Sequence, residues 1–220
     1  MVDEEPDEPP ATLPSPLGPI PIAYTSVPPT GYRLWRIVGA HQHDLGEAIP
    51  YLCSPYRETL WDRPEAIAVC KATSARWHPA RERAPALTCK CGLYATKQLP
   101  RLDLGGLVVE GMVELYGRVL EGTEGYRASK ARLIGALTLV LGCVGTDARP
   151  AGAGVYPRSY CRELVQGTVM VGRQYRPLCD EHSEALLRSN REAFGVTITS
   201  IRDWLISRYQ TEVNVRRRHQ

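Results

Sequence analysis

The chain has 220 residues, of which 43% are hydrophobic and 23% charged, with a formal net charge of +3. This composition is typical of globular proteins and excludes a chain that is disordered throughout. No apolar run reaches the ~20 residues that a membrane-spanning helix needs. The first residues are acidic, whereas a signal peptide begins with basic residues. We therefore expect a cytoplasmic protein without a membrane partner, whose seven cysteines are thiols or metal ligands and not disulfides.

Residues 1–30 form an acidic, proline-rich segment. They contain nine of the eighteen prolines, five acidic residues and no lysine or arginine. Such a segment buries too little apolar surface to order itself, so we expect a disordered tail. The alternative is that the tail binds a protein partner, with Ile20–Tyr24 as its anchor. The tail carries −5 and the whole chain +3, so residues 31–220 carry +8.

Short β-like runs begin after the tail. Tyr32–Val38 and Ile67–Cys70 are predicted as strands, and Leu107–Leu120 as a bent strand or a strand pair. Gly111 and Gly117 interrupt this last run, and glycines inside a strand predict bulges or sharp curvature. Residues 126–141 fit both a helix and a strand, and the spacing of their apolar residues favours the helix.

The remainder of the chain is predicted to be helical. Residues 143–157 are rich in glycine and read as a linker. A first helix is expected over Asp180–Phe194, with Gly195 ending it. A second is expected after a cap at Thr197 or Thr199, with Ile201, Trp204, Leu205 and Tyr209 as its apolar stripe. We therefore predict an α+β fold, in which a small β-rich domain over residues 31–142, stapled by zinc, precedes a helical C-terminal region over residues 158–220.

Four residues between positions 70 and 91 have the chemistry of a metal site. Cys70, His78, Cys89 and Cys91 offer three thiolates and one imidazole, a common ligand set for structural zinc. The single residue between Cys89 and Cys91 departs from the usual two-residue spacing. The alternative is a set of buried thiols beside a loop histidine.

The same region carries a family resemblance. The stretches Gly31–Trp35, Cys89–Ala95 (CKCGLYA), Tyr116–Val119 and Gly125–Ala128 resemble uncharacterised proteins of actinobacteria and their phages. The resemblance covers about residues 31–135. It implies a shared fold and no particular activity.

A second, weaker set of metal-ligating residues follows the linker. Cys179 and His182 have the two-residue spacing of a metal half-site, and Cys161, with Cys143, would complete it. The alternative is that the cysteines are core thiols and that His182 belongs to the first turn of a helix. Cys53 is predicted to be a buried thiol.

The C-terminal helices suggest DNA binding. Residues 189–209 resemble a helix-turn-helix, with Phe194–Val196 as the turn and Thr197–Tyr209 as the recognition helix. The recognition helix and the basic C-terminal end would then contact double-stranded DNA, its bases and its phosphates, through Ser200, Arg202, Asp203, Arg208, Arg216, Arg217 and Arg218. This interpretation predicts a zinc-stabilised, DNA-associated regulatory or accessory protein. The alternative is a protein-interaction adaptor without DNA contact.

An enzyme is the third class. The sequence has no phosphate-binding glycine loop, no G-x-S-x-G elbow and no H-E-x-x-H motif. Glu110, Glu114 and Glu121 are predicted to form a solvated face and not an acid–base pair. We therefore expect a protein without catalytic residues.

Overall fold

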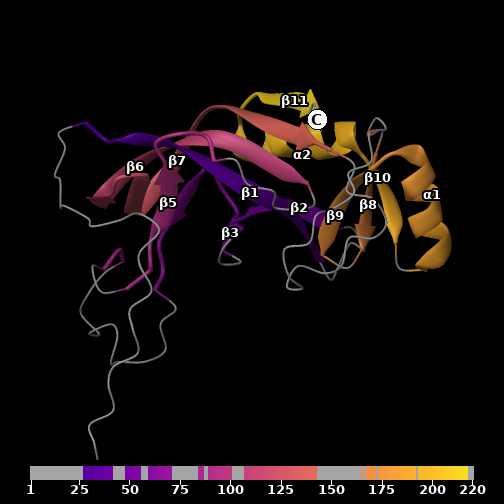
Figure 1. Ribbon diagram of the computed structural model, residues 1–220, viewed down its shortest axis with the longest axis horizontal. Coiled ribbons are helices and arrows are strands. Elements are labelled where there is room, and N and C mark those ends of the chain that lie inside the picture. Colours follow the sequence, from indigo (N-terminus) through magenta and orange to yellow (C-terminus); the bar gives the residue numbers. More distant parts are fainter. Residues whose placement is uncertain are drawn as a thin grey trace, which may run out of the picture.

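The computed structural model describes residues 27–41, 48–55, 59–70, 84–86, 89–100, 107–142, 165, 167–171, 173–191 and 193–217. Within this part of the chain, eleven strands join one mostly antiparallel sheet, with two helices beside it (Figure 1). The elements are β1 (Thr30–His41), β2 (Ala48–Cys53), β3 (Leu60–Trp61), β4 (Glu65–Ile67), β5 (Leu93–Thr96), β6 (Val108–Glu121), β7 (Gly125–Leu141), β8 (Gly167–Val171), β9 (Gln174–Leu178), α1 (Asp180–Ser189), β10 (Phe194–Thr197), α2 (Ile198–Tyr209) and β11 (Val213–Arg217).

The predicted α+β arrangement, a small β-rich domain followed by a helical region, is wrong. Strands β8, β9, β10 and β11 all lie after residue 158 and all belong to the same sheet as the earlier strands. The expected linker over residues 143–157 lies outside the described residues, as do residues 1–26 of the expected tail. The predicted tail extends to residue 30, whereas β1 already begins at Thr30.

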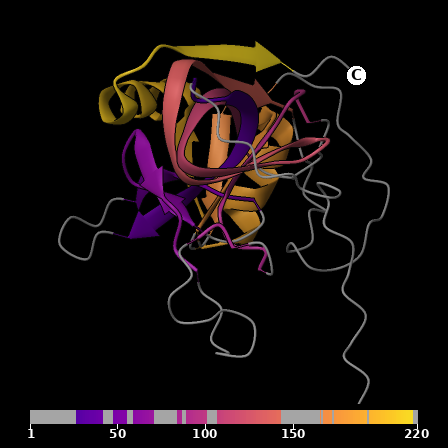
Figure 2. The same ribbon diagram turned by 90° about the vertical axis from the view of Figure 1, so that its left-hand side faces the viewer.

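The hairpin of β6 and β7 is the longest pair in the sheet. Its register shifts twice, between Glu110 and Met112 and between Tyr116 and Val119. Gly117, inside the second shift, has a φ of +75°, and a Cβ there would lie 2.3 Å from the Ser129 hydroxyl oxygen. The two bulges predicted from the glycines are therefore confirmed. Figure 2 shows the strong bend of this salmon-coloured hairpin.

The helix favoured for residues 126–141 is wrong, because these residues form β7. Leu137, Leu139 and Leu141 alternate along the strand and are buried. Apolar residues at every second position are typical of a strand, and β7 pairs with other strands along both of its edges.

The first strands close into a ring of pairings. β1 pairs with β6 along one edge and with β5 along the other, through Tyr32 and Thr96. β7 likewise pairs with β6 and with β5. The order β1–β6–β7–β5 therefore returns to β1, which leaves these four strands without a free edge over part of their length.

The C-terminal strands extend this ring. β9 meets β1 through Val38 and Gln174, and β11 runs parallel to β7. The turn of the expected helix-turn-helix is wrong, because Phe194–Val196 lie in β10 and pair with β8. Helix α1 ends at Ser189, with Asn190 as its C-cap, and not at Gly195. Neither described helix has the length and apolar character needed to cross a lipid bilayer.

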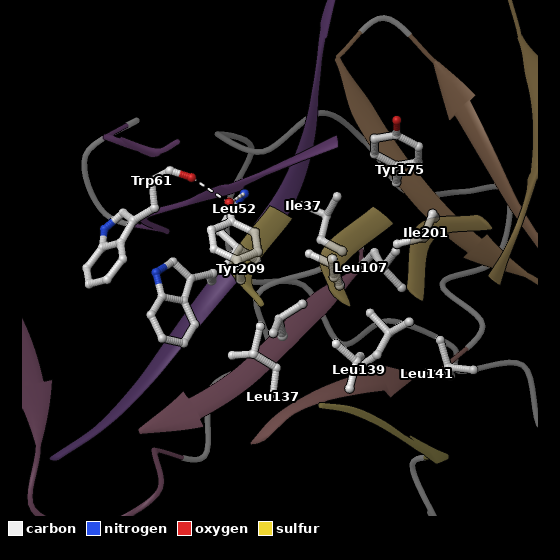
Figure 3. Close-up of a cluster of buried hydrophobic side chains, with 14 of the residues drawn as sticks. Ile37, Leu52, Trp61, Leu107, Leu137, Leu139, Leu141, Tyr175, Ile201 and Tyr209 are labelled. Atoms are coloured by element: carbon white, nitrogen blue, oxygen red, sulfur yellow. Dashed lines mark hydrogen bonds between the residues drawn. The ribbon is translucent and has the colours of Figure 1, made fainter. Parts of the chain in front are cut away.

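Helix α2 packs on the sheet as its sequence predicts. The Thr197 side chain caps it by accepting a hydrogen bond from the Ser200 N–H at 3.0 Å. Ile201, Leu205 and Tyr209 are buried in the main hydrophobic core (Figure 3). The predicted cap and apolar stripe are therefore confirmed, with Trp204 packed at the margin of the core.

Tyr209 joins α2 to two segments of the N-terminal half. Its hydroxyl donates to the Trp61 carbonyl at 2.5 Å and accepts from the Leu52 N–H at 3.2 Å (Figure 3). Burial raises the pKa of Tyr209 to about 12. The phenol therefore stays protonated at neutral pH and serves both backbone groups.

We predict that Tyr209→Phe lowers the free energy of unfolding by about 1–3 kcal/mol, because two buried backbone groups lose their partner. Urea unfolding measures this change. Ser207→Ala, at an exposed position of the same helix, is the control and is expected to shift stability by less than about 0.5 kcal/mol. Equal effects of the two substitutions would contradict this account.

Candidate metal centre

The cysteine cluster lies where a long loop leaves and rejoins β7. β4 ends with Ile67 opposite Lys130, and β5 begins with Leu93 opposite Ala128. Between them, the Ala68 N–H donates to the Ser129 carbonyl at 2.8 Å. The chain therefore leaves the edge of β7 after residue 68 and returns to the same edge at residue 93, so the two stems of the loop lie side by side.

The stems bring three of the four predicted ligands together. Cys70 follows β4, whereas Cys89 and Cys91 precede β5, and their three sulfur atoms lie within 4.8 Å of one another. The Cys70 and Cys89 sulfurs are 3.6 Å apart. Thiolates on one tetrahedral zinc, with Zn–S bonds of ~2.3 Å, lie about 3.8 Å apart. The three thiols therefore fit a metal ion with little adjustment.

Burial makes Cys91 a poor nucleophile in the absence of a cation. The side chain is 1% exposed, and burial raises the pKa of its thiol to about 11, with the neighbouring Cys89 and Cys70 adding to the rise. The Ala86 N–H, which donates to the Cys91 sulfur at 3.3 Å, lowers this pKa in part. Reactive cysteines need the opposite, a lowered pKa. A bound cation would supply the charge that stabilises the thiolate.

Two side chains from the sheet hold the turn between Cys89 and Gly92. Arg127 of β7 is 3% exposed and donates from its guanidinium to the Cys89 carbonyl. Tyr94 of β5 donates from its hydroxyl to the Lys90 carbonyl at 2.8 Å, and its ring lies 6.0 Å from the Arg127 guanidinium.

The turn also requires glycine. Gly92 has a φ of +126°, and a Cβ there would lie 2.5 Å from Cγ of Arg127. The backbone at Gly92 therefore lies so close to the Arg127 side chain that it leaves no room for a Cβ. Among the described residues, no carboxylate forms a salt bridge with Arg127.

Of the remaining predicted ligands, the structure describes only Cys179 and His182. His78 lies outside the described residues, as do Cys143 and Cys161 of the second set. The Cys179 sulfur and Nδ1 of His182 lie 3.1 Å apart at the start of α1. Within the part of the chain that the structure describes, Cys70, Cys89 and Cys91 are the one group of three or more side chains with metal-binding geometry. Cys53 is buried, as predicted.

The residues predicted to contact DNA are mostly engaged within the protein. Nε of Arg202 donates to the Val213 carbonyl at 3.0 Å, and Arg216 forms a 2.5 Å salt bridge with Glu110. The Arg208 guanidinium lies 4.3 Å from the Tyr51 ring and 5.2 Å from the Trp204 ring. The backbone N–H of Ser200 donates to the helix cap, Asp203 and Arg217 are exposed, and Arg218 lies outside the described residues.

Comparison with protein-family models, with curated proteins and with solved structures found no significant match. The resemblance to actinobacterial and phage proteins over residues 31–135 therefore stays a prediction.

Proposed function

We propose that Cys70, Cys89 and Cys91 bind one structural zinc ion, with His78 as the fourth ligand, and that the protein is a non-enzymatic interaction module. The observation that carries this proposal is the convergence of the three thiols at the base of one loop. His78 belongs to that loop, between the two stems in sequence. A metal at its base would fix the loop to the sheet, since binding free energy at such a site is folding free energy.

The charge of the surroundings supports three thiolates. Zn²⁺ with three thiolates and a neutral imidazole carries one net negative charge. Arg127, which is buried and bonded to the Cys89 carbonyl, supplies one positive charge beside it. Without an anionic centre, a buried guanidinium with no described carboxylate partner would be costly. Metal and arginine therefore stabilise each other.

The site favours a structural role over a catalytic one. Four protein ligands leave no open coordination position for a substrate or a water molecule. The three glutamates of β6 do not form an acid–base pair either. Each is in a salt bridge with a basic side chain: Glu110 with Arg216, Glu114 with Arg132, and Glu121 with Lys97. This arrangement supports a binding module more than an enzyme.

The contacts of three C-terminal arginines favour protein interaction over DNA binding. Arg202, Arg208 and Arg216 make contacts within the fold that compete with phosphate contacts. DNA binding by a basic surface weakens steeply with salt. Tight, salt-dependent binding of the full chain to duplex DNA would contradict this preference.

Cys89→Ser tests the metal. Protein purified without chelator is expected to carry about one equivalent of zinc, the amount for a single four-ligand site. Cys89→Ser is expected to lose most of this zinc and to unfold at a lower temperature, because metal binding is coupled to folding. Elemental analysis and thermal unfolding measure both effects. Cys53→Ser, at a buried thiol away from the cluster, should keep its zinc. Zinc-free wild-type protein would contradict the proposal.

Arg127→Met tests the charge balance. Loss of the compensating cation is expected to weaken zinc binding about tenfold, as is usual when a residue that supports the ligands is removed. Competition with a zinc-binding dye measures the affinity. The control is Arg132→Met on the same strand, whose side chain is exposed and paired with Glu114. Equal zinc affinities for the two variants would show that Arg127 does not offset the charge of the site.

A further inference from the structure

The three thiols of the cysteine cluster differ in how far solvent reaches them. Cys91 is 1% exposed, whereas Cys70 and Cys89 are only partly buried. The two accessible thiols also lie beside each other, with their sulfur atoms 3.6 Å apart. Oxidation of a cysteine requires that the oxidant reach its sulfur. Cys70 and Cys89 therefore meet this requirement as a pair, and Cys91 does not.

We propose that Cys70 and Cys89 are a site of reversible oxidation, at which a peroxide converts the two cysteines to one disulfide. This proposal rests on the metal-bound module proposed above, because the two oxidised residues are also two of its zinc ligands. It adds a means of regulation, since the metal and the disulfide exclude each other. Disulfides in a reducing compartment are usually transient and serve in catalysis or in redox sensing.

The reaction balances with hydrogen peroxide as the oxidant. Cysteines that bind a metal are thiolates, the form that attacks peroxide. One thiolate attacks a peroxide oxygen and breaks the O–O bond, which gives a sulfenic acid and a hydroxide that takes up a proton to form water. The second thiolate then attacks the sulfur of the sulfenic acid, forms the S–S bond and displaces a second hydroxide, which is also protonated. The two cysteines lose two electrons in all, and the peroxide gains them.

Backbone pairing with β7 holds the two sulfur atoms within reach of a bond. The Ala68 N–H is bonded to a carbonyl of β7, and Leu93 pairs with the same edge, so both loop stems are fixed near the cysteines. A disulfide bond is ~2.05 Å long, so the sulfurs must approach by about 1.6 Å. Rotation about χ1 moves a cysteine sulfur by more than this distance. The disulfide therefore requires no change in strand pairing.

Oxidation of the pair would release the metal and keep the loop closed. Of the four proposed ligands, Cys91 and His78 would remain, which is too few for a structural zinc site. The disulfide joins residues 70 and 89, so it closes the base of the same loop that the metal closes. Because the stems stay joined, reduction would return both thiols to the positions in which they bind zinc.

Peroxide treatment of the full chain tests this proposal. The purified protein is treated with hydrogen peroxide, and the zinc that it releases is measured with a chromophoric chelator. The remaining thiols are then alkylated in denaturant, and disulfide-linked peptides are identified by mass spectrometry. We expect the loss of about one equivalent of zinc and a peptide pair that joins Cys70 to Cys89. Cys91 should be recovered in its alkylated form.

Reduction of the treated protein tests whether the oxidation is reversible. Dithiothreitol with added zinc should restore about one equivalent of bound metal, because a disulfide can be reduced by a thiol whereas sulfinic and sulfonic acids cannot. The matched control is Cys53→Ser, at a buried thiol outside the cluster. This variant is expected to release and rebind zinc as the wild-type protein does.

The outcomes separate the oxidation site from the metal site. Protein that contains zinc but forms no Cys70–Cys89 disulfide, that joins Cys91 to either partner, or that passes directly to sulfinic acid would overturn the oxidation site and leave the metal site standing. Protein purified without zinc that still forms the Cys70–Cys89 disulfide would support the oxidation site and contradict the metal site.

Discussion

Backbone pairing along both edges of β7 is the constraint on which the rest of the structure depends. One edge is taken by β6, and the other is shared in turn by β5, β4 and β11. β4 and β5 pair with neighbouring positions on the same edge of β7. The two ends of the loop between them therefore lie side by side. This geometry brings the cysteines together, although Cys70 and Cys91 are far apart in sequence.

The same constraint links the cysteine cluster to its surroundings. Arg127 belongs to β7 and Tyr94 to β5, and these two residues are direct partners in the register of the two strands. Both side chains bond to carbonyls of the turn that carries Cys89 and Cys91. A change in that turn is therefore felt at the buried arginine and at Tyr94. The cysteine cluster, Arg127 and Tyr94 form one connected unit.

Local features of this fold were predictable from the sequence, whereas long-range pairing was not. The bulges at Gly111 and Gly117, the cap at Thr197 and the apolar stripe of α2 follow from residue type and spacing over a few positions. Cys70, Cys89 and Cys91 could likewise be predicted as candidate metal ligands from their residue type. The position of Arg127 beside the cysteines was not predictable. Residues 126–141 carry both a helical and a strand period, and only their pairing with β6 and β5 decides between the two. Strand pairing also decides the structure of Phe194–Val196. Gly195 suggested a turn, but these residues form a strand that pairs with β8.

X-ray absorption at the zinc edge tests the central claim most directly, because it reports the identity and distance of the ligand atoms. We expect three sulfur atoms at about 2.3 Å and one nitrogen at about 2.0 Å from a single zinc ion. His78→Ala should remove the nitrogen and leave the three sulfurs in place. A shell with fewer than three sulfurs, a shell of oxygen atoms, or protein that binds no zinc would contradict it.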